Sequence, residues 1–281
     1  AFRLEEGHLY RGADEKEMMD RSELKERLEF ALRVAKEASS FLLSHSSLAE
    51  RIEQKHENDF VTAADKATEE LIYSSIKKAY PNDGWFGEES GKRGEEKRRW
   101  MVVPIEWTVN FFCSCPNYTV SIAFEDEDGL ALGVVVVPRQ NETFWAMRGE
   151  GAFLNGNRIH TRENCDYSRT LALLVPPHRR HHLMDKYWKR MRRLYDIFTD
   201  VRSIGSAALS LCYVASGRCT CYYEMGLYPY DYSAGLLIVK EAGGEVSVIE
   251  RDGGESQDIV ATSSGIYTGV MEVVSEESGI L

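Results

Sequence analysis

The spacing of apolar residues changes along this chain of 281 residues, and that change is what most restricts its fold. From residue 20 to about residue 80, apolar positions recur every three or four residues, as in amphipathic helices. Between residues 100 and 147 they form short, dense runs that favour strands. After residue 165, helix-like and strand-like segments alternate. A chain that contains both helix-like and strand-like apolar patterns is predicted to have a mixed fold of the α+β class.

Two helices are predicted in the first 80 residues because each one begins with a capping signal. Asp20 and Glu23 resemble a capping box in front of the first apolar stripe. Thr62 is the expected N-cap of the second helix, with Asp65 as its third residue. The turn-forming sequence PNDG at residues 81–84 should end that helix.

The rest of the chain predicts two halves that are joined without a linker. The charged stretch 91–99 is expected to be a solvated loop. Strands are predicted over residues 100–104, 118–125, 130–138 and 143–147, with a hairpin turn at 126–129. Later strands are predicted at 170–175, 196–202 and 219–224, and helices at 183–194, 206–216 and 231–242. We expect an α+β half over about residues 20–165 and an α/β half over about 166–281.

Composition narrows the class of partner and the compartment. The chain has 34 Lys and Arg against 45 Asp and Glu, a net charge of −11, which disfavours a nucleic-acid partner. No apolar run is long enough to cross a membrane. Six cysteines are too few for a disulfide scaffold in a chain of this length, so we expect the protein to be located in the reducing cytoplasm. Residues 1–19 are expected to be a flexible extension or a cloning remnant.

Three groups of acidic residues lie where predicted elements begin or end. They are Asp65 in the first turn of a helix, Glu88 with Glu89 beside a loop, and Asp231 at the start of a later helix. Carboxylates from separate segments are what Mg²⁺ requires, because it prefers oxygen ligands in octahedral geometry. Each residue taken alone is equally explained as a helix cap or a solvated turn.

The sequence around these acids resembles the inositol monophosphatase family in the order and spacing of its motifs, over about residues 20–275. The matching segments are NDFVTAAD (58–65), GEES (87–90), WMVVPIEWTVNF (100–111), GEGAFLNG (149–156), RSIGSAA (202–208), YEMG (223–226) and YDYSAG (230–235). The resemblance implies a layered αβαβα sandwich, a homodimer and Mg²⁺-dependent hydrolysis of phosphate monoesters. Bound metals would activate a water and stabilise the leaving oxygen.

The resemblance also implies a role for individual residues. Glu89, Glu106, Asp231 and the backbone carbonyl of Ile105 match metal ligands, while Asp65 and Thr108 match the pair that positions the attacking water. The residues that match contacts to the sugar or inositol part of the substrate are Gly205, Ser206, Ala207 and Glu224.

The central motif departs from the family's Asp-Pro-Ile-Asp-Gly-Thr-Thr-Asn-Phe at four positions. Val103 replaces the carboxylate that bridges two metals. Without that shared anion the two metal cations repel each other, and even single charges about 4 Å apart interact by roughly 4 kcal/mol at an effective dielectric near 20. Glu106 places its oxygens further out than an aspartate would, and Trp107 replaces a glycine beside the phosphate. Val109 lacks a hydroxyl. These changes predict a badly weakened pair of metal sites.

A basic cluster, HRRHH at residues 178–182, follows the strand predicted at 170–175. It is typical of a solvated loop and helix face. An alternative is that this cluster binds an anionic ligand or partner.

Two functions follow from the sequence. The first is a family member with weak or no phosphatase activity, partial Mg²⁺ occupancy and a binding or scaffold role. The alternative is an active Mg²⁺-dependent hydrolase of an inositol, sugar or nucleotide phosphate, in which Glu106 replaces the missing bridge and Asp59 or Glu88 supplements it. The sequence is compatible with an enzyme and with a non-catalytic protein.

Overall fold

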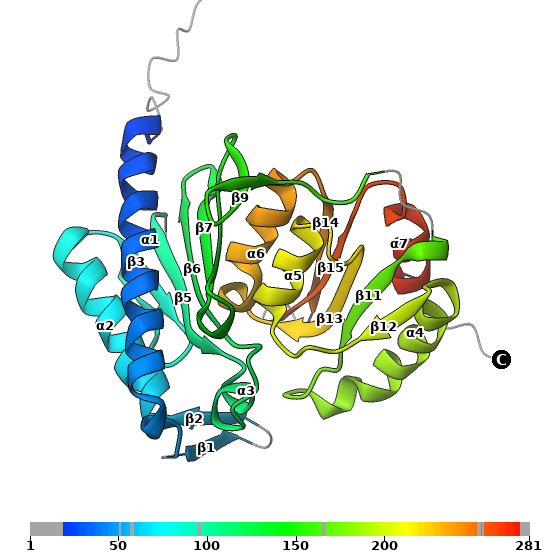
Figure 1. The fold of residues 1–281 in the computed structure, drawn as a ribbon, viewed down its shortest axis with the longest axis horizontal. Coiled ribbons are helices and arrows are strands. Elements are labelled where there is room, and N and C mark those ends of the chain that lie inside the picture. Colours follow the sequence, from blue (N-terminus) through cyan, green and yellow to red (C-terminus); the bar gives the residue numbers. More distant parts are fainter. Residues whose placement is uncertain are drawn as a thin grey trace, which may run out of the picture.

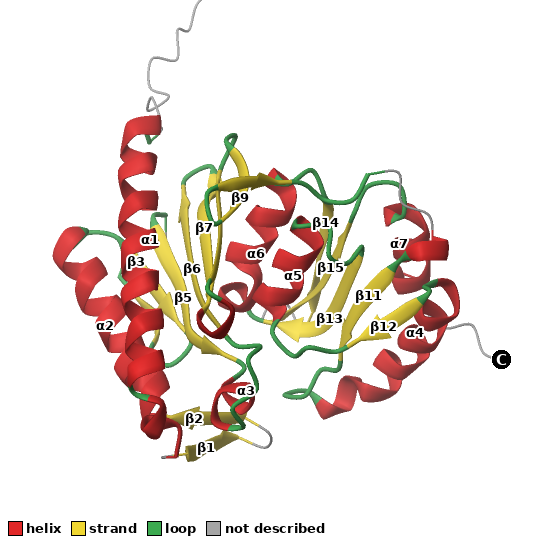
Figure 2. Cartoon of the chain, in the orientation of Figure 1, coloured by secondary structure: helices red, strands yellow, loops and turns green. Residues whose placement is uncertain are grey.

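The chain folds into five alternating layers of helices and sheets (Figure 1). This computed structural model describes residues 19–275 apart from 51, 57–58, 95–96, 164–166, 252–253 and 255. Two helices, α1 (Arg21–Ser44) and α2 (Ala63–Ala79), cover the outer face of the first sheet. Between the two sheets lie α5 (Ala207–Ala215) and α6 (Pro229–Glu241), and beyond the second sheet lie α4 (Met184–Ile197) and α7 (Tyr267–Ser275). The predicted αβαβα sandwich of the α+β class is therefore confirmed (Figure 2).

The first sheet has eight strands in the order β10-β9-β8-β7-β6-β5-β3-β4. Neighbouring strands are antiparallel except β3 and β5, which are parallel. The strands are β3 (Gly84–Gly87), β4 (Gly91–Arg93), β5 (Arg99–Glu106), β6 (Thr119–Asp126), β7 (Gly129–Val137), β8 (Glu142–Met147), β9 (Gly151–Leu154) and β10 (Asn157–Ile159). The short helix α3 (Thr108–Phe112) follows β5 almost directly.

The second sheet has the order β12-β11-β13-β15-β14. The first three strands are mutually parallel and the last two pairs are antiparallel. Its strands are β11 (Leu171–Val175), β12 (Asp200–Arg202), β13 (Cys221–Leu227), β14 (Glu245–Arg251) and β15 (Ser256–Thr262). A separate two-stranded ribbon contains β1 (Ile52–His56) and β2 (Asp59–Thr62) and leads into α2.

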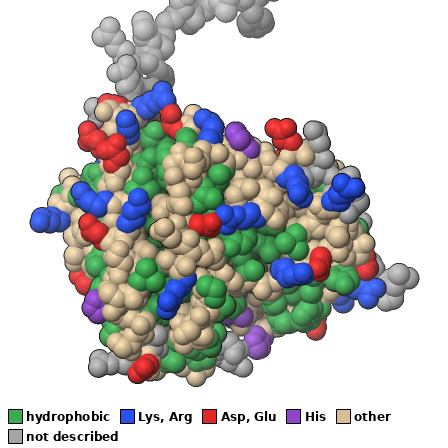
Figure 3. Space-filling model, in the orientation of Figure 1, with side chains coloured by type: hydrophobic (Ala, Val, Ile, Leu, Met, Phe, Trp, Pro, Cys, Tyr) green, Lys and Arg blue, Asp and Glu red, His purple; other side chains and the backbone are tan. Residues whose placement is uncertain are grey.

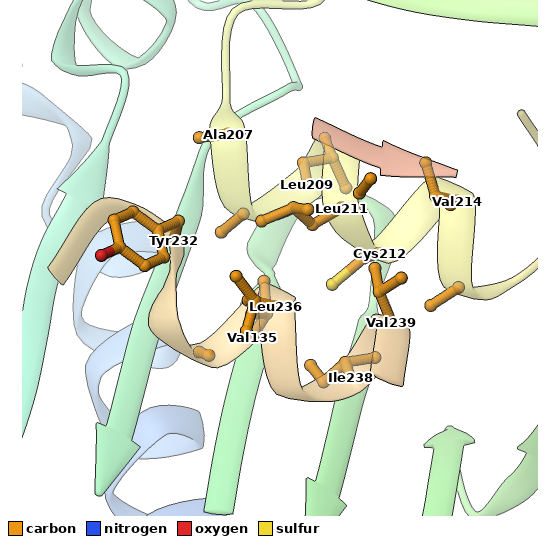
Figure 4. Packing of buried hydrophobic residues seen from close by; sticks show 14 of the residues in the cluster. Val135, Ala207, Leu209, Leu211, Cys212, Val214, Tyr232, Leu236, Ile238 and Val239 are labelled. Carbon is orange, nitrogen blue, oxygen red and sulfur yellow. The ribbon is translucent and has the colours of Figure 1, made fainter. Parts of the chain in front are cut away.

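The central helices α5 and α6 form the middle of the core because both are apolar on nearly all sides. They pack against each other and against β7, with Leu211 and Leu236 among the buried contacts (Figure 4). Helix α6 approaches β7 so closely that a methyl group added at Gly133 would lie 2.6 Å from the carbonyl oxygen of Ala234. Helices buried between two sheets need an apolar surface all round, which these sequences supply.

Most charged side chains stay on the outside of this core. On the face drawn in Figure 3, basic and acidic side chains are interspersed over the surface. No helix in the described part of the chain is long and apolar enough to cross a membrane.

Several predictions of local structure can be compared with the observed elements. Asp20 caps α1 by accepting from the Ser22 N–H, but the Glu23 carboxylate of the expected capping box is paired with Arg27. Thr62 and Asp65 form the capping box of α2. The prediction of a loop over residues 91–99 is wrong at both ends, because Gly91–Arg93 pairs with β3 and Arg99 begins β5. The strand expected at 196–202 is only Asp200–Arg202, since α4 continues to Ile197. The expectation for residues 1–19 falls almost entirely outside the described residues, although Met19 is buried in the core.

Candidate functional site

The predicted site residues come from several elements that meet between the two sheets. The β5–α3 junction brings Glu106 and Trp107, strand β13 brings Glu224, and the start of α6 brings Asp231. The loop between β11 and α4 closes the pocket with Arg179. The pocket is partly open to solvent and has a cavity volume of about 20 Å³.

Asp65 and Thr108 are hydrogen-bonded to each other although they are 43 residues apart. Thr108 Oγ1 donates to Asp65 Oδ1 at 2.9 Å, and Thr62 donates to Asp65 Oδ2 through its hydroxyl at 2.6 Å and its amide at 2.7 Å. Burial raises the pKa of Asp65 to about 6, although the bonds from Thr62 and Thr108 oppose that rise. Asp65 is thus both a helix-capping residue and the partner of Thr108.

The Glu106 carboxylate is held by the N-terminus of α5. Ala208 N–H donates to its two oxygens at 2.9 and 3.0 Å, Thr119 Oγ1 donates at 2.9 Å, and the Ser206 hydroxyl also donates to it. A carboxylate is favoured there by the helix dipole and the open amides of the first turn. Burial raises the pKa of Glu106 to about 7, while the bonds from Ser206 and Ala208 lower it. The extra methylene of a glutamate lets this side chain reach α5.

Trp107 adopts the left-handed backbone conformation that the family's glycine allows without strain, with φ and ψ both 66°. Its ring lies 4.5 Å from the His178 ring, measured between centroids, and against Gly205. A methyl group at Gly205 would come within 2.8 Å of the indole, so the ring and the turn before α5 are packed without a gap. The tryptophan therefore turns the chain as a glycine would and also fills space beside the pocket.

Asp231 and Glu88 meet at the guanidinium group of Arg179. Arg179 Nη2 donates to Glu88 Oε1 at 2.7 Å, and Arg179 Nη1 lies 3.8 Å from Asp231 Oδ1. Asp231 also closes a capping box at the start of α6, since the Tyr228 N–H donates to its Oδ2 at 2.8 Å. Both carboxylate side chains are almost fully buried, at 6% exposed each.

Two of the residues predicted to contact the substrate, Ala207 and Glu224, line the pocket, and Gly205 and Ser206 come directly before Ala207. Ser206 is the N-cap of α5 and accepts from the Leu209 N–H at 3.0 Å. Glu224 is buried on β13 and accepts from Tyr222 Oη at 2.6 Å. Burial raises the pKa of Glu224 well above its ordinary value, and the charges of Asp231 and Glu106 add to the effect. Gly205 and Ala207 flank Ser206, so the four predicted substrate residues lie near the acidic side chains.

The structure separates Glu89, a predicted metal ligand, from this pocket. The Glu89 amide donates to Glu69 Oε2 at 2.8 Å, and its side chain lines a different surface pocket together with Lys66 and Arg93. Its neighbour Glu88 is the one that faces Arg179 and Asp231. The carbonyl oxygen of Ile105 accepts a long bond, 3.5 Å, from Thr108 Oγ1. The side chain of Asp59 lies outside the described residues.

These donors do not fit two Mg²⁺ ions that share a bridging carboxylate. The Val103 side chain is buried and has no ligand atom, and both Glu106 oxygens accept hydrogen bonds from α5. Arg179 places a positive charge beside Asp231, where the resemblance puts the second metal. Among the described residues, no three His, Cys, Asp or Glu side chains come together in a way that could hold a metal ion.

The αβαβα layers and this cluster of acids define a protein of the inositol monophosphatase class. The model of the inositol monophosphatase family matches residues 23–278, so the chain belongs to that family. It is 38% identical over 224 residues to the Nus factor SuhB of Escherichia coli K12, and the alignment covers 78% of this chain and 84% of the relative. With the Nus factor SuhB of Haemophilus influenzae it shares 39% identity over 255 residues, covering 88% and 95%.

Solved structures agree with these sequence relationships. The extragenic suppressor protein suhB of Bartonella henselae superposes with a TM-score of 0.84 at 29% identity, covering 90% of this chain and all of that one. The IMPase of Thermotoga maritima superposes with a TM-score of 0.79 at 31% identity, covering 89% and 97%.

Sequence reasoning missed Arg179 and favoured Glu89 over Glu88. The basic cluster at 178–182 was a visible signal, but its spacing alone does not indicate that one arginine enters an acidic pocket. Which of two adjacent glutamates points inward depends on the bend after β3, which the sequence pattern does not define.

Proposed function

We propose that this chain is an inositol monophosphatase family member with little or no phosphatase activity, which uses the family fold to bind or to act as a scaffold. Its ligand would be a small phosphorylated molecule, and its Mg²⁺ occupancy weak or partial. We expect a cytoplasmic homodimer without a nucleic-acid or membrane partner. The net charge of −11 supports the absence of a nucleic-acid partner, because the phosphates of a nucleic acid would repel an acidic protein.

The observation that carries this proposal is the position of the Glu106 carboxylate. To bind a metal it would have to give up its bonds from Ser206, Ala208 and Thr119. Charge-assisted hydrogen bonds of this kind contribute about 1.5–3 kcal/mol each. The loss of a carboxylate at Val103 means that no neighbouring ligand compensates for that cost.

The size and the lining of the pocket support the same proposal. The cavity volume of about 20 Å³ is small, so little free space remains beside the residues that line the pocket. Trp107 lines the pocket together with His178 and Arg179, which belong to the β11–α4 loop. Substrate would have to displace this packing before any reaction.

The direct experiment is hydrolysis of inositol monophosphate by the purified protein with Mg²⁺. We expect turnover far below 1 s⁻¹, the lower end of ordinary enzyme rates, with the Thermotoga maritima IMPase assayed in parallel. A turnover of about 1 s⁻¹ or more would contradict the proposal.

A double substitution tests whether the central motif causes the loss. Val103→Asp with Trp107→Gly restores the bridging carboxylate and the glycine, and should create or raise phosphatase activity when Mg²⁺ is present. The matched control is Val103→Asn with Trp107→Gly, which has the same shape without the charge. Equal activity in the two variants would mean that the bridging charge is not the missing element.

The alternative function is an active hydrolase with rearranged ligands. It is favoured by the bond between Thr108 and Asp65, because that pair matches the one that positions the attacking water in the family. Glu88 and Asp231 would then supply ligands after Arg179 moves away. A structure with Mg²⁺ that contains two ions within about 4 Å of each other would support this alternative. An empty site or a single ion would exclude it.

A further inference from the structure

The loop that carries Arg179 is built to hold its guanidinium group in the acidic pocket. Two prolines precede it, and tight turns close around them, with His178 N–H donating to Pro176 O at 2.8 Å and Arg180 N–H to Pro177 O at 2.9 Å. Proline restricts the backbone, so this loop has few alternative conformations.

Both neighbours of Arg179 are fixed to the walls of the pocket. The His178 ring packs against Trp107, with an angle of 43° between the two ring planes. On the other side, Arg180 donates through Nε to the Gly226 carbonyl at 3.2 Å and through Nη2 to Tyr228 Oη at 3.1 Å. Arg179 is therefore anchored on both sides, and its own side chain is only 27% exposed.

The carboxylates around Arg179 would repel one another without a cation. Glu88 and Asp231 are each 6% exposed, and buried Glu224 lies within electrostatic range of Arg179. Removing one partner of a buried ion pair is costly because the other charge stays unpaired and poorly solvated. In the family to which this chain belongs, divalent cations would supply that charge.

We propose that Arg179 is a resident cation that replaces a divalent metal as the counter-ion of Glu88 and Asp231. This inference goes beyond the proposed function, because it says what holds the site together rather than what it has lost. A guanidinium supplies fixed positive charge and planar donors. It cannot supply an activated water or an open coordination position, which are the catalytic properties of a metal. The site is then stable without metal and has no metal-dependent chemistry.

The test compares Arg179→Met with the wild-type protein by thermal unfolding at neutral pH, with and without millimolar Mg²⁺. We expect the variant to melt about 5 °C or more lower without Mg²⁺, because Glu88 and Asp231 lose their counter-ion. Arg179→Lys should lose less, since it keeps a charge but not the forked geometry. The matched control is Arg192→Met, which removes an exposed arginine of α4 that pairs with Asp196.

A second pair of measurements separates loss of charge from loss of packing. Adding Glu88→Gln to Arg179→Met should recover part of the lost melting temperature, because it removes the unpaired carboxylate. In titration calorimetry, Arg179→Met should bind Mg²⁺ at least tenfold more tightly than the wild type, and the double variant should not. The inference is overturned if Glu88→Gln recovers nothing, or if wild type and Arg179→Met bind Mg²⁺ equally.

These outcomes are distinct from failure of the proposed function. Phosphatase turnover of the wild-type protein tests that function without any change at Arg179. An inactive wild type whose melting temperature does not depend on the Glu88–Arg179 pair would contradict only the role of Arg179.

Discussion

At the scale of single residues, Trp107 combines an unfavourable backbone with favourable packing. A side chain in the left-handed region costs roughly 1–2 kcal/mol relative to glycine. The indole offsets this cost through its contacts with His178 and Gly205. The substitution from glycine therefore preserves the turn while it fills the space that a glycine leaves open.

This balance predicts that Trp107→Gly is more stable than Trp107→Ala, by about 1 kcal/mol. Both variants lose the ring, but only alanine keeps the backbone penalty. Chemical unfolding of the two variants measures the difference directly. Equal stabilities, or a more stable alanine variant, would show that residue 107 does not need the left-handed conformation.

Glu106 predicts a dependence of stability on pH. Its pKa in the folded protein is about 7, above the ordinary value of 4.5 for a glutamate. The folded state therefore holds this proton more tightly, so the stabilising contribution is complete below about pH 4.5 and is lost as the pH rises through 7. Relative to Glu106→Gln, the wild-type free energy of unfolding should fall by on the order of 2–3 kcal/mol over that range.

The measurement is urea unfolding of wild type and Glu106→Gln at several pH values between 4 and 8. Glu37→Gln, on the exposed face of α1, is the control and should follow the wild-type curve. A constant difference between wild type and Glu106→Gln across this range would mean that Glu106 is not buried against α5.

At the scale of elements, the start of α2 serves the helix and the site at once. Thr62 Oγ1 accepts from the Ala64 N–H at 3.2 Å and donates to Asp65, which in turn accepts from Thr108. The capping box thus fixes the Asp65 carboxylate in one orientation. Asp65 can therefore be a helix cap and a site residue at once, because the same carboxylate makes both sets of contacts.

Thr62→Ala should lower the free energy of unfolding by about 1–2 kcal/mol, because it removes a buried cap and leaves Asp65 with one donor fewer. Ser74→Ala, on the exposed side of the same helix, should change it by less than about 0.5 kcal/mol. Similar losses in the two variants would show that the cap contributes no more than an ordinary surface contact.

The contact between α6 and β7 sets the spacing of the layers. Because an added methyl at Gly133 would meet the backbone of Ala234, Gly133→Ala should push the helix away from the sheet. We expect a loss of about 1–3 kcal/mol in the free energy of unfolding, as for other overpacked cores. An unchanged stability would mean that the two elements are less closely packed than this structure has them.

At the scale of the whole molecule, the layers could be predicted from the sequence better than the site could. Capping residues and apolar stripes identified α1 and α2, and dense apolar runs identified β5, β6, β7 and β8 of the first sheet but not β3, β9 or β10. Strand β4 was missed because an edge strand of three polar residues has the composition of a loop. Strands β14 and β15 were also missed, since their polar residues hide the apolar alternation.

The site was harder to predict because its geometry depends on contacts between distant segments. The carboxylate of Glu106 is bound by residues about 100 positions later in the chain, and Glu88 is paired with an arginine 91 positions away. Motif order indicated segments that the structure brings together around the pocket. It did not show which of two glutamates faces inward, or that an arginine would lie among the acids.

We propose that this family member does not hold the pair of Mg²⁺ ions. Calorimetric titration of Mg²⁺ into the wild-type protein tests it most directly, because the stoichiometry is read without assuming a substrate. We expect at most one ion per chain, bound weakly, since Val103 provides no bridge and Glu106 is held by α5. Two ions bound per chain would contradict it.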